Sequence, residues 1–260
     1  SPNALAELCG AAQTPPMHPA QPVCGKESFM SYIISPPEET ALQAHLHKLR
    51  TQLHEDPELS WQEHRTTRLV RRELEALGLE PVPLGLPTGT AALLRGALPG
   101  PTVGLRADLD ALPITERTGA EFASRVPGVM HACGHDIHMA ALLGAARLLA
   151  ARREQLAGNV LFLFQPAEET GEGAEGCCEL FRLEHIDEIY GLHNLPGFRF
   201  GQVYTTLGSF APASFGMTMR FHGKTSHAAY PKDGICPAYA VGRLLAALPE
   251  ISAPGNFSGM

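Results

Sequence analysis

The stretch "NVLFLFQPAEET", residues 159–170, joins an uninterrupted apolar run to two adjacent carboxylates. An apolar run of this length without polar alternation predicts a strand that is buried on both faces, as in parallel sheets covered by helices. Glu168 and Glu169 are therefore expected just beyond the carboxyl end of a buried strand. In open α/β sheets this edge is where ligands bind.

The flanking sequence alternates strands with helices. Apolar strands are predicted in "TAALLRG", "TVGLRAD" and "EIYGLHN", and helices in "DIHMAALLGAARLLAARREQ" and "GCCELFRLEH". Upstream, residues 36–78 read as two amphipathic helices that are separated near Asp56 and Pro57, and the second stops at Gly78. This order predicts an α/β fold with a mostly parallel sheet covered by helices.

Three segments differ in composition. Residues 1–36 are rich in proline, alanine and glutamine without periodicity, which predicts a flexible tail. Residues 37–208 carry the α/β pattern. Residues 209–260 begin a second unit, with a period-two strand "SFGMTMRFHGK" and a helix "DGICPAYAVGRLLAALPE", which are too few elements to form a core alone.

Composition narrows the classes of function. The chain has 260 residues, 44% of them hydrophobic, and a formal net charge of -7, so it offers no basic surface for nucleic acid. No apolar run approaches the roughly 20 residues that span a bilayer, and no secretory signal is visible, so a cytoplasmic location is expected. The six cysteines are too sparse for a disulfide framework, and we expect them to be reduced.

Metal-binding side chains gather where strands end and where a helix begins. The predicted strands are followed by Arg106, Asp108 and Asp110, by Glu168 and Glu169, and by His193, while Cys133 and His135 precede the apolar helix. Thiolate, imidazole and carboxylate together suit zinc, manganese, cobalt or nickel rather than magnesium or calcium. These ligands outnumber those that one catalytic ion takes, which favours a site for two ions.

The chemistry of this cluster allows two interpretations. In the first, one of Glu168 and Glu169 binds metal while the other moves protons, which would equip the site to hydrolyse an amide. The amino end of the helix would also help Cys133 toward the thiolate. In the second, Cys133 is a nucleophile with His135 or His131 as its base. This second interpretation leaves Glu168, Glu169 and His193 without a role.

The remaining histidines are expected to be peripheral. His138 falls one helical turn inside the predicted helix and belongs either to the surroundings of the site or to the core. His131 and Asp136 are expected to be supporting or structural. The histidines of the first helices and the tail are expected to be solvated: His18, His45, His47, His54 and His64.

The motifs "RADLDALP", "MHACGHDIHMA", "FQPAEE", "GLHN" and "HGKTSHAAYP" occur in this order between about residues 45 and 248. In order and spacing they resemble the amidohydrolase branch of the aminoacylase and carboxypeptidase metallopeptidase superfamily, which includes hippurate hydrolase, N-acyl-amino-acid amidohydrolases and auxin-conjugate hydrolases. The resemblance implies a metal-dependent hydrolase that cleaves the amide of small N-acyl amino acids. A dipeptidase or aminoacylase of the same superfamily is the alternative.

The resemblance also implies roles for individual residues. It makes Cys133, His135, Glu169 and His193 the metal ligands and Glu168 the carboxylate that moves the proton. Asp110 matches a supporting carboxylate, and Asp108 and Arg106 belong with it less firmly. His227 matches a histidine that stabilises the oxyanion in the other subunit of a homodimer.

The resemblance assigns the segments as well. Residues 37–208 become the amino-terminal part of a metal-binding catalytic domain, and residues 209–260 an incomplete lid and dimerisation domain. The family's chain is about half as long again and returns to the catalytic domain with one more histidine ligand. On this basis the 260-residue form is expected to bind metal weakly or to hydrolyse poorly, or to be an inactive binding module.

Overall fold

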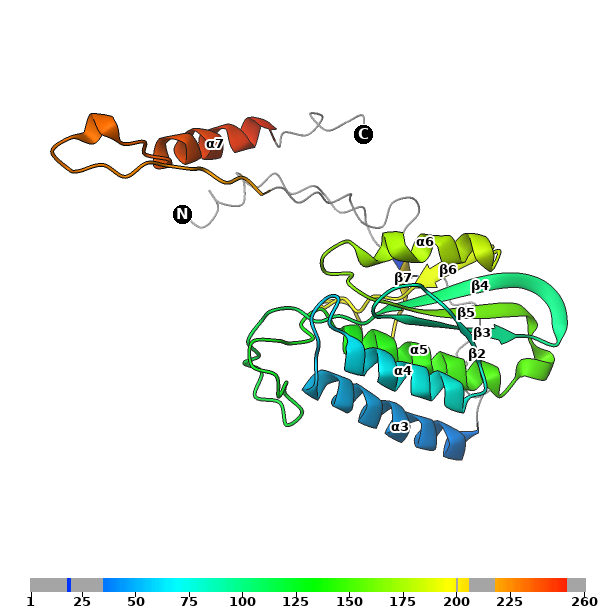
Figure 1. Cartoon of the computed structure of the whole chain (residues 1–260). Helices are drawn as coiled ribbons and strands as arrows, with labels where there is room; N and C mark the ends of the chain where they lie inside the picture. The colour runs from blue at the N-terminus through cyan, green and yellow to red at the C-terminus, as the bar shows by residue number, and fades with distance from the viewer. Residues whose placement is uncertain (1–17, 20–34, 200, 206–217, 252–260) are drawn as a thin grey trace. The chain divides into compact units, whose positions relative to one another are not determined.

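A five-stranded sheet organises the larger of two units in this computed structural model, which describes residues 18–19, 35–199, 201–205 and 218–251. The strand order is β2-β3-β5-β4-β6 (Figure 1). Their bounds are Glu80–Val82 for β2, Thr90–Arg95 for β3, Leu98–Asp108 for β4, Ala157–Gln165 for β5 and Glu188–Gly191 for β6. Only β3 runs against the other four strands, so the prediction of a mostly parallel sheet is confirmed.

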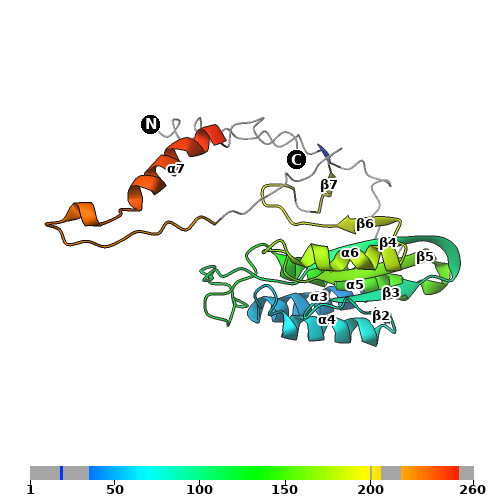
Figure 2. The ribbon, with the colours of Figure 1, turned by 45° about the horizontal axis from the view of Figure 1, so that its top comes forward.

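Helices cover both faces of this sheet. The helices α3 (Pro36–Glu55), α4 (His64–Ala76) and α5 (His135–Ala150) lie on one side and α6 (Gly173–Leu183) on the other, as Figures 1 and 2 both show. A capping box between Ser35 and Glu38 starts α3. The chain leaves α4 through Gly78, whose positive φ of 67° is readily available to glycine.

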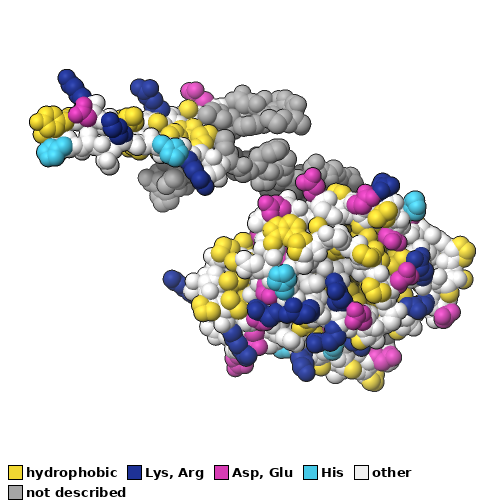
Figure 3. All heavy atoms as spheres, viewed as in Figure 1, with side chains coloured by type: hydrophobic (Ala, Val, Ile, Leu, Met, Phe, Trp, Pro, Cys, Tyr) yellow, Lys and Arg dark blue, Asp and Glu magenta, His cyan; other side chains and the backbone are white. Residues whose placement is uncertain are grey.

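The central strand explains why both faces are covered. Phe162 and Phe164 of β5 are fully buried against α3, α4 and α5, while Leu161 and Leu163 point to the opposite face and pack with α6. The apolar run that predicted burial on both faces thus fills two separate cores, and that prediction is confirmed. On the outer face of α4, the arginines remain exposed, and basic side chains gather over α3 and α4 in Figure 3.

Several element boundaries differ from those expected. The helix predicted over residues 136–155 divides into α5 and a short 3₁₀ turn at Arg153–Gln155 (η1). The strand predicted from Thr102 begins earlier, at Leu98, and a register shift separates its first residues from the rest of the ladder. The strand in "EIYGLHN" ends at Gly191, and all four residues of β6 are exposed.

The structure divides into two compact units, residues 20–203 and residues 1–19 with 204–260. In the described part of the second unit, β1 (His18–Pro19) pairs antiparallel with β7 (Tyr204–Thr205). A 3₁₀ turn, η2 (Pro231–Asp233), precedes α7 (Ala238–Ile251). No helix among the described residues is long and apolar enough to cross a membrane.

The predicted strand "SFGMTMRFHGK" is wrong over the residues that are described. Its first four residues, 214–217, lie outside the described part of the chain, and residues 218–223 form no strand. Lys224 makes only an isolated antiparallel bridge with Ile235. No other described strand lies beside this segment to take up its backbone hydrogen bonds, which a strand requires. Most of the tail predicted over residues 1–36 also lies outside the described residues.

Candidate metal centre

His135 is the first residue of α5 and lies where the carboxyl ends of β4 and β5 meet the helix. Gly134 turns the chain into α5 with a φ of +91°. The backbone conformation favours glycine, and a β-carbon at this position would lie 2.4 Å from Asn194 Oδ1 and would displace that side chain. The motif "CGH" therefore brings a thiol and an imidazole to the edge of the sheet.

The ring of His135 is completely buried and is oriented by one hydrogen bond. Nδ1 donates to the backbone oxygen of Asp110 at 2.8 Å, which leaves the Nε2 lone pair free. Nε2 faces Asp108 at 3.9 Å and both Glu168 and Glu169 at 3.8 Å, without a hydrogen bond to any described residue. A ring fixed through one nitrogen, with the other nitrogen facing carboxylates, is typical of a metal ligand.

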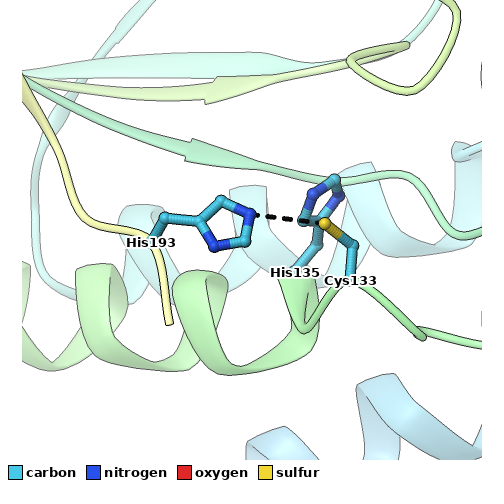
Figure 4. A group of neighbouring side chains, drawn as sticks. All are labelled: Cys133, His135 and His193. Carbon is cyan, nitrogen blue, oxygen red and sulfur yellow. Dashed lines mark hydrogen bonds between the residues drawn. The ribbon is translucent and has the colours of Figure 1, made fainter. Parts of the chain in front are cut away.

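Three groups of potential ligands meet at His135. Within each group the ligand atoms lie within 4.8 Å of one another; the groups are Cys133–His135–His193, Asp108–His135–His138 and His135–Glu168–Glu169. Figure 4 shows the first group, in which Cys133 Sγ lies 3.3 Å from His193 Nε2. His193 Nδ1 in turn donates to the backbone oxygen of Asn194 at 2.8 Å.

This donor set fits divalent transition metal ions. Besides His135 Nε2, one oxygen of Asp110 and one of Glu169 are buried without a hydrogen-bond partner in the described part of the chain. Buried polar atoms that lack partners are costly unless an ion or water satisfies them. Sulfur, nitrogen and oxygen ligands together favour a first-row transition metal.

Asp110 holds the carboxylate side of the site together. Its Oδ2 accepts hydrogen bonds from Ser60 Oγ at 2.7 Å and from the backbone N–H of Glu169 at 2.9 Å. Burial alone would raise the pKa of Asp110, but hydrogen bonds from His135, Glu169 and Ser60 outweigh burial and lower the pKa to about 2. Asp110 is thus a fixed negative charge behind His135.

Cys133 and Glu169 are both biased toward their protonated forms. Burial raises the pKa of the Cys133 thiol to about 12, and the negative charge of Glu169 adds to this effect. Burial also raises the pKa of Glu169, with the neighbouring carboxylate of Glu168 acting in the same direction. Without metal, the pKa of Cys133 therefore shifts in the direction opposite to that expected from the amino end of α5, because burial, and after it the neighbouring carboxylates, favour the thiol.

This pKa also weighs against Cys133 as a nucleophile with a histidine base, since only the thiolate attacks. A divalent cation beside the sulfur would reverse the balance and hold the thiolate.

An ion pair and two buried histidines surround the candidate ligands. The Arg106 guanidinium pairs with Asp108, and Arg106 Nε donates to Gln165 Oε1 at 3.1 Å. His138 is buried, and the centroid of its ring lies 4.6 Å from the ring centroid of His193 and 5.3 Å from that of His135. His131 is buried with both ring nitrogens unpartnered among the described residues, and burial lowers its pKa to about 4.

The prediction that His54 is solvated is wrong. This residue is buried between Asp136 Oδ2, 2.8 Å from its Nδ1, and Glu116 Oε1, 3.3 Å from its Nε2. Arg50 also pairs with Asp136 at 2.7 Å. The reason is that this side of α3 packs against the start of α5 rather than facing water.

Of the other histidines expected to be solvated, His47 and His64 are exposed, whereas His45 is half-buried and lies 3.1 Å from Glu73. Nothing is described of the side chain of His18. His227 belongs to the second unit, where it is exposed and its Nδ1 accepts the N–H of Ala229 at 3.2 Å.

Sequence analysis missed four residues that contact the site or its support: Arg50, His54, Ser60 and Glu63. Arg50 and His54 lie on α3, and Ser60 and Glu63 in the connection between α3 and α4, all far along the chain from their partners. Their residue types are common on helix surfaces, and they carried no signal of their own.

The fold and the ligand groups together define an α/β protein with a candidate centre for divalent metal. Comparison with known proteins is consistent with this class. Residues 104–248 match the model of the peptidase family M20/M25/M40, and the chain belongs to this family.

Two curated relatives and one solved structure are similar to this chain. N-acetyl-L-cysteine deacetylase of Bacillus subtilis is 43% identical over 82% of this chain and 51% of its own, and an IAA-amino acid hydrolase of Arabidopsis thaliana is 41% identical over 78% and 46%. The crystal structure of a dinuclear metal-binding M20 peptidase from Bacillus subtilis is 47% identical, with a TM-score of 0.59 over 61% of this chain and 45% of that one. The chain spans about half the length of these relatives.

Proposed function

We propose that the protein is a metal-dependent amidohydrolase that cleaves the amide bond of N-acyl amino acids or similar small conjugates. The observation that carries this proposal is the orientation of His135, whose Nδ1 is tied to Asp110 while its Nε2 faces Glu168 and Glu169. The relatives named as an N-acetyl-L-cysteine deacetylase and an IAA-amino acid hydrolase support this class of substrate.

Two divalent ions would be held by Cys133, His135, Glu169 and His193. This donor set favours zinc or manganese and also suits cobalt or nickel. When bound, these ions would supply a Lewis acid for the amide carbonyl. Asp110 orients His135 and the backbone of Glu169, and Asp108, whose charge is paired with Arg106, lies beside them.

The two glutamates are assigned by their different environments. The side chain of Glu168 is 39% exposed, whereas that of Glu169 is 18% exposed and has a buried oxygen without a partner among the described residues. The deeper Glu169 therefore suits an ion. The carboxylate of Glu168 reaches the open side, where it accepts a proton from the attacking water and passes it to the leaving amine.

The second unit enters this proposal through the family resemblance. Residues 209–260 would belong to a lid and dimerisation domain, residues 37–208 to the catalytic domain, and His227 would hydrogen-bond the developing oxyanion across a homodimer. We also propose a cytoplasmic location and small-molecule substrates, with neither nucleic acid nor membrane as a partner.

A substrate panel tests the proposed reaction. The whole protein, loaded with zinc or manganese, is assayed on a series of N-acyl amino acids and of dipeptides, with metal content measured by mass spectrometry. We expect hydrolysis of the N-acyl amino acids, loss on chelation, and a rate for Glu168→Gln lower by about 100-fold or more, the range for a lost proton-transfer group. Cleavage of dipeptides alone would favour the dipeptidase alternative, and unchanged activity of Glu168→Gln would refute the assignment of the base.

A further inference from the structure

The turn that carries Glu168 and Glu169 has an unusual backbone. Ala167, directly before the two glutamates, has a φ of +50° and is completely buried. Residues with a β-carbon adopt this left-handed conformation only when their surroundings impose it, and such residues concentrate at functional sites. Neighbouring groups must therefore impose the conformation of Ala167.

Glu63 is one of these groups. It immediately precedes α4, its side chain is completely buried, and Oε1 accepts the backbone N–H of Ala167 at 2.8 Å. Oε2 accepts the hydroxyl of Thr88 at 2.7 Å. No lysine, arginine or histidine in the described part of the chain forms an ion pair with it. A buried carboxylate that bonds only to a hydroxyl and a backbone amide is costly, so its retention calls for a reason.

Close packing leaves the turn little freedom. A β-carbon on Gly89 would lie 2.6 Å from Pro166 Cδ, and one on Gly173 would lie 1.6 Å from the backbone oxygen of Pro166. The backbone of Gly173 also donates to the oxygen of Ala167 at 3.1 Å. Pro166 is therefore closely packed by Gly89 and Gly173, and the backbone oxygen of Ala167 is held by Gly173.

Two carboxylates then bracket Glu168. Glu63 binds the N–H of Ala167, one residue before it, and Asp110 binds the N–H of Glu169, one residue after it. Asp110 belongs to the site, whereas Glu63 comes from the start of α4, 104 residues away along the chain. The bracket fixes the direction in which the two glutamates leave the backbone.

We propose that Glu63 is a positioning residue that holds the left-handed turn at Ala167 and thereby aims Glu168 and Glu169 at His135. This inference rests on the proposed function of the two glutamates. Glu63 itself does not contact substrate or metal. It acts through the backbone, so its loss changes the geometry of the carboxylates more than the binding of substrate.

The test compares two substitutions of Glu63 in the whole, metal-loaded protein. Glu63→Met retains volume but removes both acceptors, and the N–H of Ala167 is left buried and unpaired. Glu63→Gln keeps an acceptor for Ala167 and can donate to Thr88. For Glu63→Met we expect kcat on an N-acyl amino acid to fall about tenfold to a hundredfold, as for other residues that orient ligands, with KM little changed. Glu63→Gln should restore most of kcat.

Glu58 provides a matched control. It is also a buried carboxylate near the start of α4, but its side chain accepts the N–H and the hydroxyl of Thr66, at 2.8 and 3.0 Å, and does not reach the turn. Glu58→Met should lower the melting temperature without lowering kcat per folded molecule. If Glu58→Met and Glu63→Met reduce kcat equally, Glu63 has a merely structural role and the proposal fails.

A second readout does not depend on turnover. Titration with Co²⁺ reports ligand geometry through the visible absorption of the ion, and affinity through the titration curve. Glu63→Met should bind Co²⁺ about tenfold or more weakly and with an altered spectrum, whereas Glu58→Met should match the unsubstituted protein. An unaltered spectrum and affinity for Glu63→Met would overturn the proposal even if no N-acyl amino acid proved to be a substrate.

Loss of folding in Glu63→Met would not end the test. Thr88→Val removes one of the two donors to Glu63 and leaves the carboxylate in place. It should reduce kcat and Co²⁺ affinity in the same direction but less strongly, and unchanged values for this variant would refute the positioning role. A protein that binds Co²⁺ as expected but cleaves none of the substrate panel would contradict the proposed function and leave the positioning role supported.

Discussion

The candidate centre has a buried half and an exposed half, and they are held in different ways. In the buried half, His135 and Glu169 are tied by hydrogen bonds to Asp110, which itself follows a strand of the sheet. In the exposed half, the half-buried Cys133 contacts the exposed His193, which follows β6, whose residues are all exposed. We therefore expect the fold to preorganise the buried half, and the exposed half to depend more on bound metal.

The largest expected effect comes from removing the residue that all three ligand groups share. His135→Ala should lower metal affinity more than about 100-fold, beyond the range for residues that only orient ligands, because each group loses its common nitrogen. Metal content after dialysis, measured by mass spectrometry beside circular dichroism, checks this result. His64→Ala, an exposed histidine at the start of α4, is the control. Retention of two ions by folded His135→Ala would show that the buried half does not organise the site.

Substitutions in the exposed half should weaken metal binding without destabilising the fold. Cys133→Ser and His193→Ala each remove a ligand from one group rather than from three, so each should reduce affinity less than His135→Ala does, while the melting temperature of the metal-free protein stays unchanged. Competition with a metal-binding dye gives the affinity. Cys178→Ser, at an exposed cysteine of α6, controls for loss of a thiol. A large drop in the melting temperature of either variant would mean that the exposed half is also part of the folded framework.

The division between halves also shows what the sequence could predict. Strand ends share one edge of a sheet, so the polar residues after β4 and β5 and before α5 could be grouped without a structure. The contacts that orient them come from elsewhere. Glu63 reaches Ala167 across 104 residues, and His54 reaches Asp136 across 82. Such pairs follow from how α3 and α4 pack on the sheet, which no local pattern specifies.

The strand that was predicted but is not formed in residues 218–223 has the opposite cause. Its alternation of apolar and polar residues is a valid local signal, but a strand persists only with neighbours that complete its hydrogen bonds. The prediction that His54 is solvated was wrong for a related reason. A histidine near the end of an amphipathic helix looks solvated until the helix is seen to cover the start of α5, where Asp136 requires a partner.

His54 contacts Asp136, the residue next to His135 at the start of α5. The contribution of this contact to the stability of the fold should depend on pH. The hydrogen bond with Asp136 is the main cause that raises the pKa of His54, and Glu116 adds to it. Because the folded pKa lies above the unfolded value of about 6.5, this stabilisation is complete below about pH 6.5 and is lost as pH rises through the folded pKa.

His54→Gln keeps a hydrogen bond but not the charge. It should therefore lower the free energy of unfolding by about 1 kcal/mol at pH 6, which is the difference between a charged and a neutral hydrogen bond, and by less at pH 9. Melting temperatures between these pH values test the prediction, with His47→Gln, an exposed position on α3, as the control. A difference between His54→Gln and the unsubstituted protein that stays constant with pH would show that the charge of His54 contributes nothing.

Asn194 contacts both His138, which lies beside His135, and His193 of the exposed half, and its substitution should have the smallest effect on metal affinity among the residues of the site. Its side-chain oxygen lies 2.7 Å from His138 Nε2, and its backbone oxygen accepts His193 Nδ1. Asn194→Ala removes only the first contact, so we expect a cost of about 0.5 to 1.5 kcal/mol and a loss of metal affinity of less than about tenfold. The same dye competition measures it. If Asn194→Ala weakened metal binding as much as Cys133→Ser, this one contact would matter as much as a ligand, and the two halves would act as one unit.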